Sequence, residues 1–96
     1  MTPPSPDEIV VRHNAAANRF EAAMGAHLAV AEYVLEDGRM VLTHTFVPPE
    51  LRGRGLAEKL VRPALDLARA EGRRVVPQCS YVATFIERHP EYQDLL

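Results

Sequence analysis

This sequence has a single cysteine, a small net charge and no long apolar run. Its 96 residues include a single cysteine, Cys79, so no disulfide can form within the chain. The formal net charge of -2 argues against a general nucleic-acid binder, because such proteins carry a clear excess of basic residues. No apolar run approaches the roughly 20 residues that a membrane span requires, so no membrane partner is expected.

The first seven residues, MTPPSPD, lack the charged-then-apolar layout of a secretory signal. Their prolines oppose both helix formation and strand pairing. We therefore expect residues 1–7 to be a disordered lead-in and residues 8–96 to form a single domain, since a chain of this length can build one hydrophobic core. The cytoplasm is the expected compartment.

Three segments in the first half of the chain have the composition of strands. Residues 9–12 and 19–24 read as short strands, although the alanine-rich stretches AAAN and EAAM leave helix possible. Residues 26–47 contain two alternating segments around Asp37-Gly38, which is the strongest short hairpin signal in the sequence. We predict an antiparallel hairpin whose first arm has one largely apolar face.

The apolar period changes after VPPE, where residues recur at three- and four-residue spacing. The sequence predicts a helix from Leu56 that stops at Gly72, a residue favoured in left-handed helix caps. Pro63 interrupts this pattern, so we expect either a kink or a place in the first turn. The buried stripe of this helix is predicted to include Leu56, Leu60, Ala64 and Leu67.

The last quarter of the chain predicts one more strand and one more helix. RRVVPQC reads as a short strand, and SYVATFIERH reads as a helix that ends at Pro90. The tail EYQDLL stays open. The order of strand, strand, hairpin, helix, strand and helix indicates an α+β or mixed α/β fold with helices packed on a sheet.

Two of the five glycines lie together in the stretch VPPELRGRGLAEKLV. A strand-to-helix turn needs at most one glycine, so the pair Gly53 and Gly55 suggests that an anion approaches the backbone closely. The first amides of the following helix have no partners within the helix and carry partial positive charge. Neither common nucleotide motif is present, because Glu58 replaces the last glycine of G-x-G-x-x-G and no Gly-Lys-Ser/Thr follows.

This segment resembles the acyl-CoA pyrophosphate loop of the GNAT superfamily of N-acetyltransferases, written Arg/Gln-x-x-Gly-x-Gly/Ala. Arg52, Gly55 and Ala57 occupy its three defined places. The segments RHN, RFE, LTHTFVPPELRGRGLAEKLV, ALDLARAEG, VVPQCSYV and ERHPEY are similar to the small single-domain branch of the superfamily. The resemblance covers nearly everything after residue 8.

The resemblance implies a compact GNAT-like fold: a mostly antiparallel mixed sheet with two main helices, splayed open where CoA inserts. It implies acetyl-CoA as co-substrate, with the backbone at Phe46 and Val47 pairing with the pantetheine arm. The second helix, starting near Ser80, would flank the cleft, with Tyr81 and Phe85 as possible contacts. The pyrophosphate would be bound by the amides of Arg52, Gly53, Arg54, Gly55, Leu56 and Ala57.

Catalysis requires a neutral acceptor amine, whereas an ordinary lysine-type amine is almost wholly protonated at pH 7. His44 is the candidate base, because it lies in the strand leading to the loop and a neutral imidazole can accept a proton. The alternative is a hydrogen-bonded histidine of the sheet without a chemical role. The position of His44 in the family pattern favours the catalytic role.

Cys79 lies at a strand-to-helix junction, where helix amides can lower the pKa of a thiol. It either receives the acetyl group covalently or serves as a wall of the cleft during direct transfer to the amine. The histidines His13, His27 and His89 lack the spacing of a metal site, so no metal is expected. Five basic residues read as a solvated surface from which one could reach the 3'-phosphate of CoA: Lys59, Arg62, Arg69, Arg73 and Arg74.

The predicted function is an acetyl-CoA-dependent N-acetyltransferase acting on a primary amine of a small molecule or protein. The alternative is a non-catalytic acyl-CoA-binding or protein-interaction module that retains the fold. The expected state is a monomer or a weak homodimer, because a small open sheet can bury an edge against a second copy.

Overall fold

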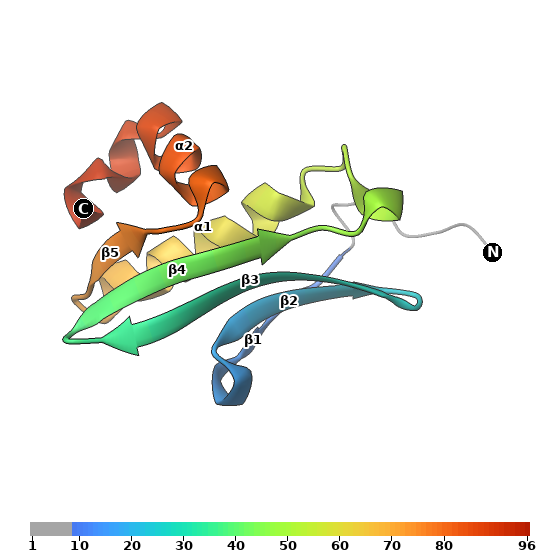
Figure 1. Ribbon diagram of the computed structural model, residues 1–96, viewed down its shortest axis with the longest axis horizontal. Helices are drawn as coiled ribbons and strands as arrows, with labels where there is room; N and C mark the ends of the chain where they lie inside the picture. The colour runs from blue at the N-terminus through green and yellow to red at the C-terminus, as the bar shows by residue number, and fades with distance from the viewer. Residues whose placement is uncertain (1–8) are drawn as a thin grey trace.

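The computed structural model describes residues 9–96, which form one five-stranded sheet with helices packed on it (Figure 1). The predicted lead-in, residues 1–7, lies outside the described part. The strands are β1 (Val11–Asn14), β2 (Arg19–Met24), β3 (His27–Glu36), β4 (Arg39–Phe46) and β5 (Arg74–Pro77). Their spatial order follows the chain, with antiparallel pairing from β1 to β4 and parallel pairing between β4 and β5. The predicted mixed α+β fold is confirmed.

The β3–β4 hairpin turns at the predicted dipeptide. Asp37 and Gly38 have φ values of 52° and 75°. Two successive positive φ angles are what a two-residue type I′ turn requires, and its twist matches the right-handed twist of the strands. In β3 the face that carries Ala29, Ala31 and Tyr33 is buried, and it faces the helices.

The first strand lies two residues further along than predicted, at residues 11–14 rather than 9–12. The turn after β1 sets where the strand ends. The Asn14 side chain accepts a hydrogen bond from the Ala17 amide and caps a short 3-10 helix, Ala15–Ala17. Asn18 then takes a left-handed conformation, and β2 begins at Arg19. The AAAN stretch is therefore a turn, whereas EAAM belongs to a strand.

The first helix, α1 (Leu56–Ala70), begins at the predicted residue and ends before Gly72, whose φ of 68° is left-handed. The amide of Arg73 closes the end by donating to the carbonyl of Ala68 at 2.8 Å. Pro63 lies inside the helix rather than in its first turn, so the early-turn alternative is wrong. The helix accommodates it because only one intrahelical hydrogen bond is lost.

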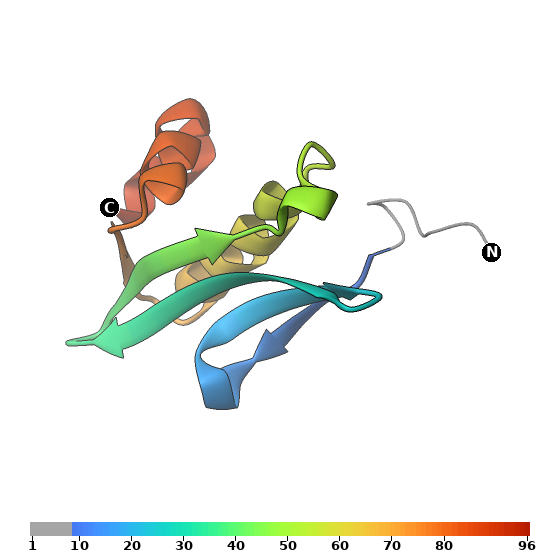
Figure 2. The same ribbon diagram turned by 45° about the vertical axis from the view of Figure 1, so that its right-hand side comes forward.

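The C-terminal elements are slightly shorter than the sequence suggested. β5 spans residues 74–77 of the predicted RRVVPQC strand, and α2 (Ser80–Arg88) ends one residue before the expected His89. The ambiguous tail forms a 3-10 helix, Pro90–Leu95. Figures 1 and 2 show this tail folding back beside α2.

A single apolar core joins one face of the sheet to both helices. Six residues of α1 are buried, and they contact mainly β2 and β3. The other face of the sheet is uncovered and carries partly exposed apolar side chains, among them Leu28, Val34 and Phe46. The buried set from the helices includes Leu60, Val61, Ala64, Leu65, Val82, Phe85 and Ile86.

A β-bulge in β4 decides which side chains of that strand reach the helices. Leu42 pairs with Tyr33, and His44 pairs with Glu32, so Thr43 is an extra residue without a partner in β3. Beyond the bulge, Thr45 pairs with Ala31 on the buried face. His44 therefore projects to the uncovered face, since successive side chains of a strand point to opposite faces.

Candidate active site

The sheet opens between β4 and β5. Their parallel pairing ends at Leu42 and Pro77, and the amide of Cys79 makes a last hydrogen bond to the carbonyl of Leu42 at 2.9 Å. β4 continues to Phe46, and in the described part of the chain no strand pairs with this extension on the β5 side. The split thus leaves residues 43–46 without a strand partner on one edge, where the Thr45 amide contacts the Cys79 thiol instead.

A short loop connects the end of β4 to α1. A 3-10 helix, Pro49–Leu51, is anchored by the buried Leu51 side chain. Gly53 and Gly55 follow with φ values of 82° and 73°, where a side chain would be strained. The guanidinium of Arg52 donates through Nε to the carbonyl of Val47 at 3.0 Å, so this arginine braces the loop and occupies one carbonyl predicted to meet pantetheine.

A small hollow lies at the start of α1. The first helical hydrogen bond there runs from the amide of Lys59 to the carbonyl of Gly55. Within residues 9–96, no backbone amide from Gly53 to Glu58 donates to a backbone carbonyl, and Gly55 caps the helix without a side-chain bond. The hollow measures about 190 Å³ and is lined by Val47, Leu51, Arg52, Gly53, Gly55, Leu56 and Ala57.

Most residues predicted for the pyrophosphate loop therefore gather around one hollow. Leu56 lines the hollow although the residue is only 2% exposed, because it packs mainly into the core. Arg54 lies in the same loop, is exposed, and does not line the hollow. Phe46 is also outside the lining and lies at the end of β4 with its ring 41% exposed.

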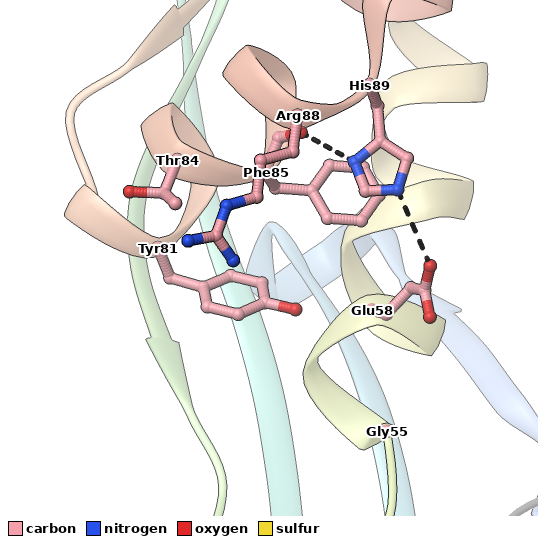
Figure 3. A pocket seen from close by; sticks show the side chains of 7 residues that line it. All are labelled: Gly55, Glu58, Tyr81, Thr84, Phe85, Arg88 and His89. Atoms are coloured by element: carbon pink, nitrogen blue, oxygen red, sulfur yellow. Dashed lines mark hydrogen bonds and ion pairs between the residues drawn. The ribbon is translucent and has the colours of Figure 1, made fainter.

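A second, larger hollow of about 260 Å³ lies between the start of α1 and α2 (Figure 3). The predicted contacts Tyr81 and Phe85 line it, whereas Ser80 does not. Gly55 lines both hollows, so they meet at this residue, and we refer to the two together as the groove. The complete lining of the second hollow is Gly55, Glu58, Tyr81, Thr84, Phe85, Arg88 and His89.

The imidazole of His89 lies in the wall of this second hollow, where it contacts Phe85 and Glu58. It stacks on the ring of Phe85 with 3.9 Å between centroids, and its Nδ1 lies 2.7 Å from the carbonyl oxygen of Phe85. Its Nε2 lies 3.8 Å from a carboxylate oxygen of Glu58, which also accepts a hydrogen bond from Arg62 at 3.0 Å (Figure 3). Glu58 thereby links α1 to the end of α2.

Sequence reasoning missed Glu58, Thr84, Arg88 and His89 as residues of this groove. The helical period contained the signal, because positions three, four and seven residues after Tyr81 share its face of α2. What the sequence lacked was the packing of α2 against the start of α1.

Cys79 lies at the N-terminus of α2 and is half-buried. Its Sγ lies 3.6 Å from the hydroxyl of Thr45, which β4 presents beside the split. Burial raises the pKa of the Cys79 thiol, but hydrogen bonds from the Thr45 hydroxyl and from backbone amides at Thr45, Tyr81 and Val82 outweigh it, so the net pKa is lowered. The thiolate is thus favoured relative to an ordinary cysteine.

His44 lies on the opposite side of β4 from Cys79. Its ring is exposed and stacks loosely on Phe46, with 6.3 Å between centroids. The imidazole of His44 makes no hydrogen bond within the described residues. The alternative of a sheet histidine with a hydrogen-bonded ring is therefore not observed there. The structure places His44 and Cys79 on the two faces of the split rather than side by side.

Residues 9–96 contain no helix long and apolar enough to cross a bilayer. The same residues contain no group of three or more histidine, cysteine, aspartate or glutamate side chains arranged to hold a metal ion. Two of the histidines have other contacts: His13 Nε2 lies 2.6 Å from the Tyr33 hydroxyl, and His27 lies 3.8 Å from Glu50.

A family model for GCN5-related N-acetyl-transferases matches residues 19–95, which include the loop, the split strands and both helices. The chain belongs to the GCN5-related N-acetyltransferase family. The resemblance noted in the sequence is therefore confirmed over residues 19–95.

Relatives of this acetyltransferase-family chain occur among vertebrate proteins. It is 35% identical to Protein NATD1 of Bos taurus over 95 residues, covering 93% of this chain and 84% of that protein. It is 34% identical to Protein NATD1 of Homo sapiens over 85 residues, covering 85% of this chain and 75% of that protein. Each match spans most of both chains.

A solved structure shares the fold of this family member. The solution structure of a GCN5-like protein from Staphylococcus aureus superposes with a TM-score of 0.72 at 25% identity, covering 90% of this chain and 85% of that chain. The compact GNAT-like arrangement of sheet and helices is thus confirmed.

Proposed function

We propose that this protein transfers the acetyl group of acetyl-CoA to a primary amine. The observation that carries the proposal is the hollow lined by Gly53, Gly55, Leu56 and Ala57, whose amides have no backbone partner within residues 9–96. Amides at a helix start, without side chains in the way, bind phosphate groups through hydrogen bonds and the helix dipole. Membership of an acetyltransferase family makes a pyrophosphate ester of CoA the matching ligand.

The split between β4 and β5 gives the pantetheine arm a place to lie. Residues 43–46 keep one edge free of strand pairing, and an extended amide chain can bond such an edge as an added strand would. The edge leads from the hollow at Val47 back towards Cys79. A molecule held at the loop and along this edge therefore brings its thioester towards Cys79 and Thr45.

The transfer requires a neutral amine to attack the thioester carbonyl. A C–N bond forms as the C–S bond breaks, CoA leaves as a thiolate, and the proton lost by the amine is taken by a base. We assign that base to His44, whose exposed imidazole lies on the open face of the split. The acceptor then approaches from the uncovered face of the sheet, while CoA lies on the helix side.

Cys79 gives the reaction a second route. Its thiolate can attack the thioester, release CoA as a thiolate, and hold the acetyl group as a new thioester until the amine displaces it. The lowered pKa of the Cys79 thiol supports this route, and direct transfer remains the other. A mass increase of one acetyl group on Cys79 after mixing with acetyl-CoA alone distinguishes covalent from direct transfer.

The competing function is an acyl-CoA-binding module without catalysis. Selective binding to the native state raises the melting temperature, so a rise with acetyl-CoA but not with ATP supports the loop assignment. Release of free CoA in the presence of a panel of amines then separates an enzyme from a binder. A free thiol with a lowered pKa suits a reducing compartment, and we place the reaction in the cytoplasm.

A further inference from the structure

The basic residues that the sequence offered for the 3'-phosphate of CoA are already engaged by protein groups. The pairs and distances are Arg62 with Glu58 at 3.0 Å, Arg69 with Asp94 at 2.7 Å, and Arg73 with Glu71 at 3.0 Å. Arg74 donates to the carbonyl oxygens of Asp94 and Leu96 at 3.2 and 2.9 Å. Lys59 does not line the groove beside the loop. An arginine held in this way must break a contact before it can bind a ligand.

Arg88 differs from these arginines because its side chain has no partner among the described residues. It lies on α2 and lines the second hollow together with Tyr81 and Thr84 (Figure 3). Among the described residues it has no ion pair and no hydrogen bond from its side chain. A guanidinium with five donors and no acceptor partner is well suited to a phosphate group.

The other charges facing this hollow are already balanced. Glu58 is engaged by Arg62 and lies close to His89, so its carboxylate is directed towards two basic groups. The unpaired charge in the lining is therefore that of Arg88. Tyr81 adds an exposed flat ring that suits a nucleobase, because aromatic side chains stack on bases.

The second hollow adjoins the amide hollow through Gly55, which lines both. In CoA the ribose that carries the 3'-phosphate is joined directly to the pyrophosphate. A pyrophosphate seated on the amides at the start of α1 therefore leaves the phosphorylated ribose within the adjoining space. This step rests on the proposed function.

We infer that Arg88 binds the 3'-phosphate of CoA in the groove between α1 and α2. Arg88 is then a specificity residue: it makes the protein distinguish CoA from 3'-dephospho-CoA, which has the same pantetheine and pyrophosphate. A hydrogen-bonded contact between two charged groups gives about tenfold discrimination or more.

The test measures the dissociation constants of CoA and 3'-dephospho-CoA by calorimetry, at fixed ionic strength, for three proteins. The wild type is expected to bind CoA at least about tenfold more tightly than dephospho-CoA. Arg88→Gln is expected to bring this ratio close to one while leaving the affinity for dephospho-CoA unchanged. Arg12→Gln, which removes the same charge from an exposed position on β1, is expected to keep the wild-type ratio.

Three results overturn the inference, and they separate it from the proposed function. If the wild type binds both ligands equally well, the proposed CoA site stands and only the role of Arg88 is wrong. The same conclusion follows if Arg88→Gln keeps the wild-type ratio of affinities, including the case in which it lowers the affinity for both ligands equally. Wild type that binds neither ligand removes the proposed function itself and the inference with it.

Discussion

The two halves of β4 differ in almost every respect that concerns function. Residues 39–42 pair on both sides, with β3 and with β5, and carry the buried side chains of Met40 and Leu42. Residues 43–46 follow a bulge, have no partner on the β5 side within the described chain, and end in the exposed ring of Phe46. One strand thus provides core at one end and open backbone at the other.

This difference shows how a small domain separates stability from chemistry. Both ends of β4 lead into turns with positive φ, at Gly38 before the strand and at Gly53 and Gly55 after it. Gly38 closes a hairpin, whereas the two later glycines precede amides that lack backbone partners. The same residue type closes a hairpin at one end and lines the candidate hollow at the other.

The largest effect is expected from Gly55→Glu, which places a negatively charged side chain at the lip of both hollows. We expect CoA affinity to fall by at least about a hundredfold, because the added carboxylate fills the space proposed for the pyrophosphate and repels its negative charge. Gly38→Glu is the matched control: its φ of 75° is close to the 73° of Gly55, and it adds the same charge to the hairpin end. Calorimetry checks both variants after circular dichroism has shown that they fold.

If Gly38→Glu lost as much CoA affinity as Gly55→Glu, general strain rather than the loop would explain the result. Strain alone is similar in the two variants, at roughly 1–2 kcal/mol for a non-glycine residue in the left-handed region. Equal losses would therefore contradict the comparison between the two ends of β4.

The next effect concerns His44 on the open face. We expect His44→Gln to lower kcat by about a hundredfold or more while CoA affinity stays unchanged, because general-base catalysis is worth that much and the imidazole lies away from the loop. His27→Gln, at the start of β3, controls for the loss of an imidazole elsewhere on the sheet. An unaltered kcat in His44→Gln with the best amine would remove His44 from the mechanism.

A stability difference is expected between the two halves of β4. Leu42→Ala removes a side chain that is 1% exposed and should lower the free energy of unfolding by about 2–5 kcal/mol. Phe46→Ala removes a ring that is 41% exposed and should cost less than about 1.5 kcal/mol. Urea titrations of the two variants measure the difference, and similar losses would show that the open half also stabilises the fold.

The smallest effect is expected at the hydroxyl that faces Cys79. Thr45→Val removes a donor that favours the thiolate, so the pKa of the Cys79 thiol should rise. The rate of alkylation by iodoacetamide should then increase only at higher pH than in the wild type. Thr43→Val, whose hydroxyl bonds the carbonyl of Glu32 instead, should leave the pH profile of alkylation unchanged.

Local sequence signals predicted the elements whose cause is itself local. Asp37-Gly38 specified the hairpin, the three- and four-residue spacing specified α1, and Gly72 specified its end. The start of β1 was misplaced because a side-chain cap by Asn14, rather than the apolar residues before it, fixes the register. A single hydrogen bond of this kind is invisible in an apolar pattern.

The candidate site was predictable only where one short segment builds it. The glycine loop could be read from residues 52–57, since its chemistry lies in its own backbone. The bulge at Thr43 puts His44 on the uncovered face and Thr45 on the buried face, and it depends on pairing with β3, which the sequence of β4 alone does not reveal. Arg88 enters the groove only through the packing of α2 near the start of α1.

The most direct measurement follows the backbone amides of the isotope-labelled protein by NMR during titration with acetyl-CoA. The amide signals of residues 53–58 should move most, because these groups have no backbone partner within residues 9–96 and would then donate to the pyrophosphate. The amides of Asp37 and Gly38 should stay in place. Saturating acetyl-CoA that left residues 53–58 unmoved, or shifted only signals elsewhere, would contradict the central claim.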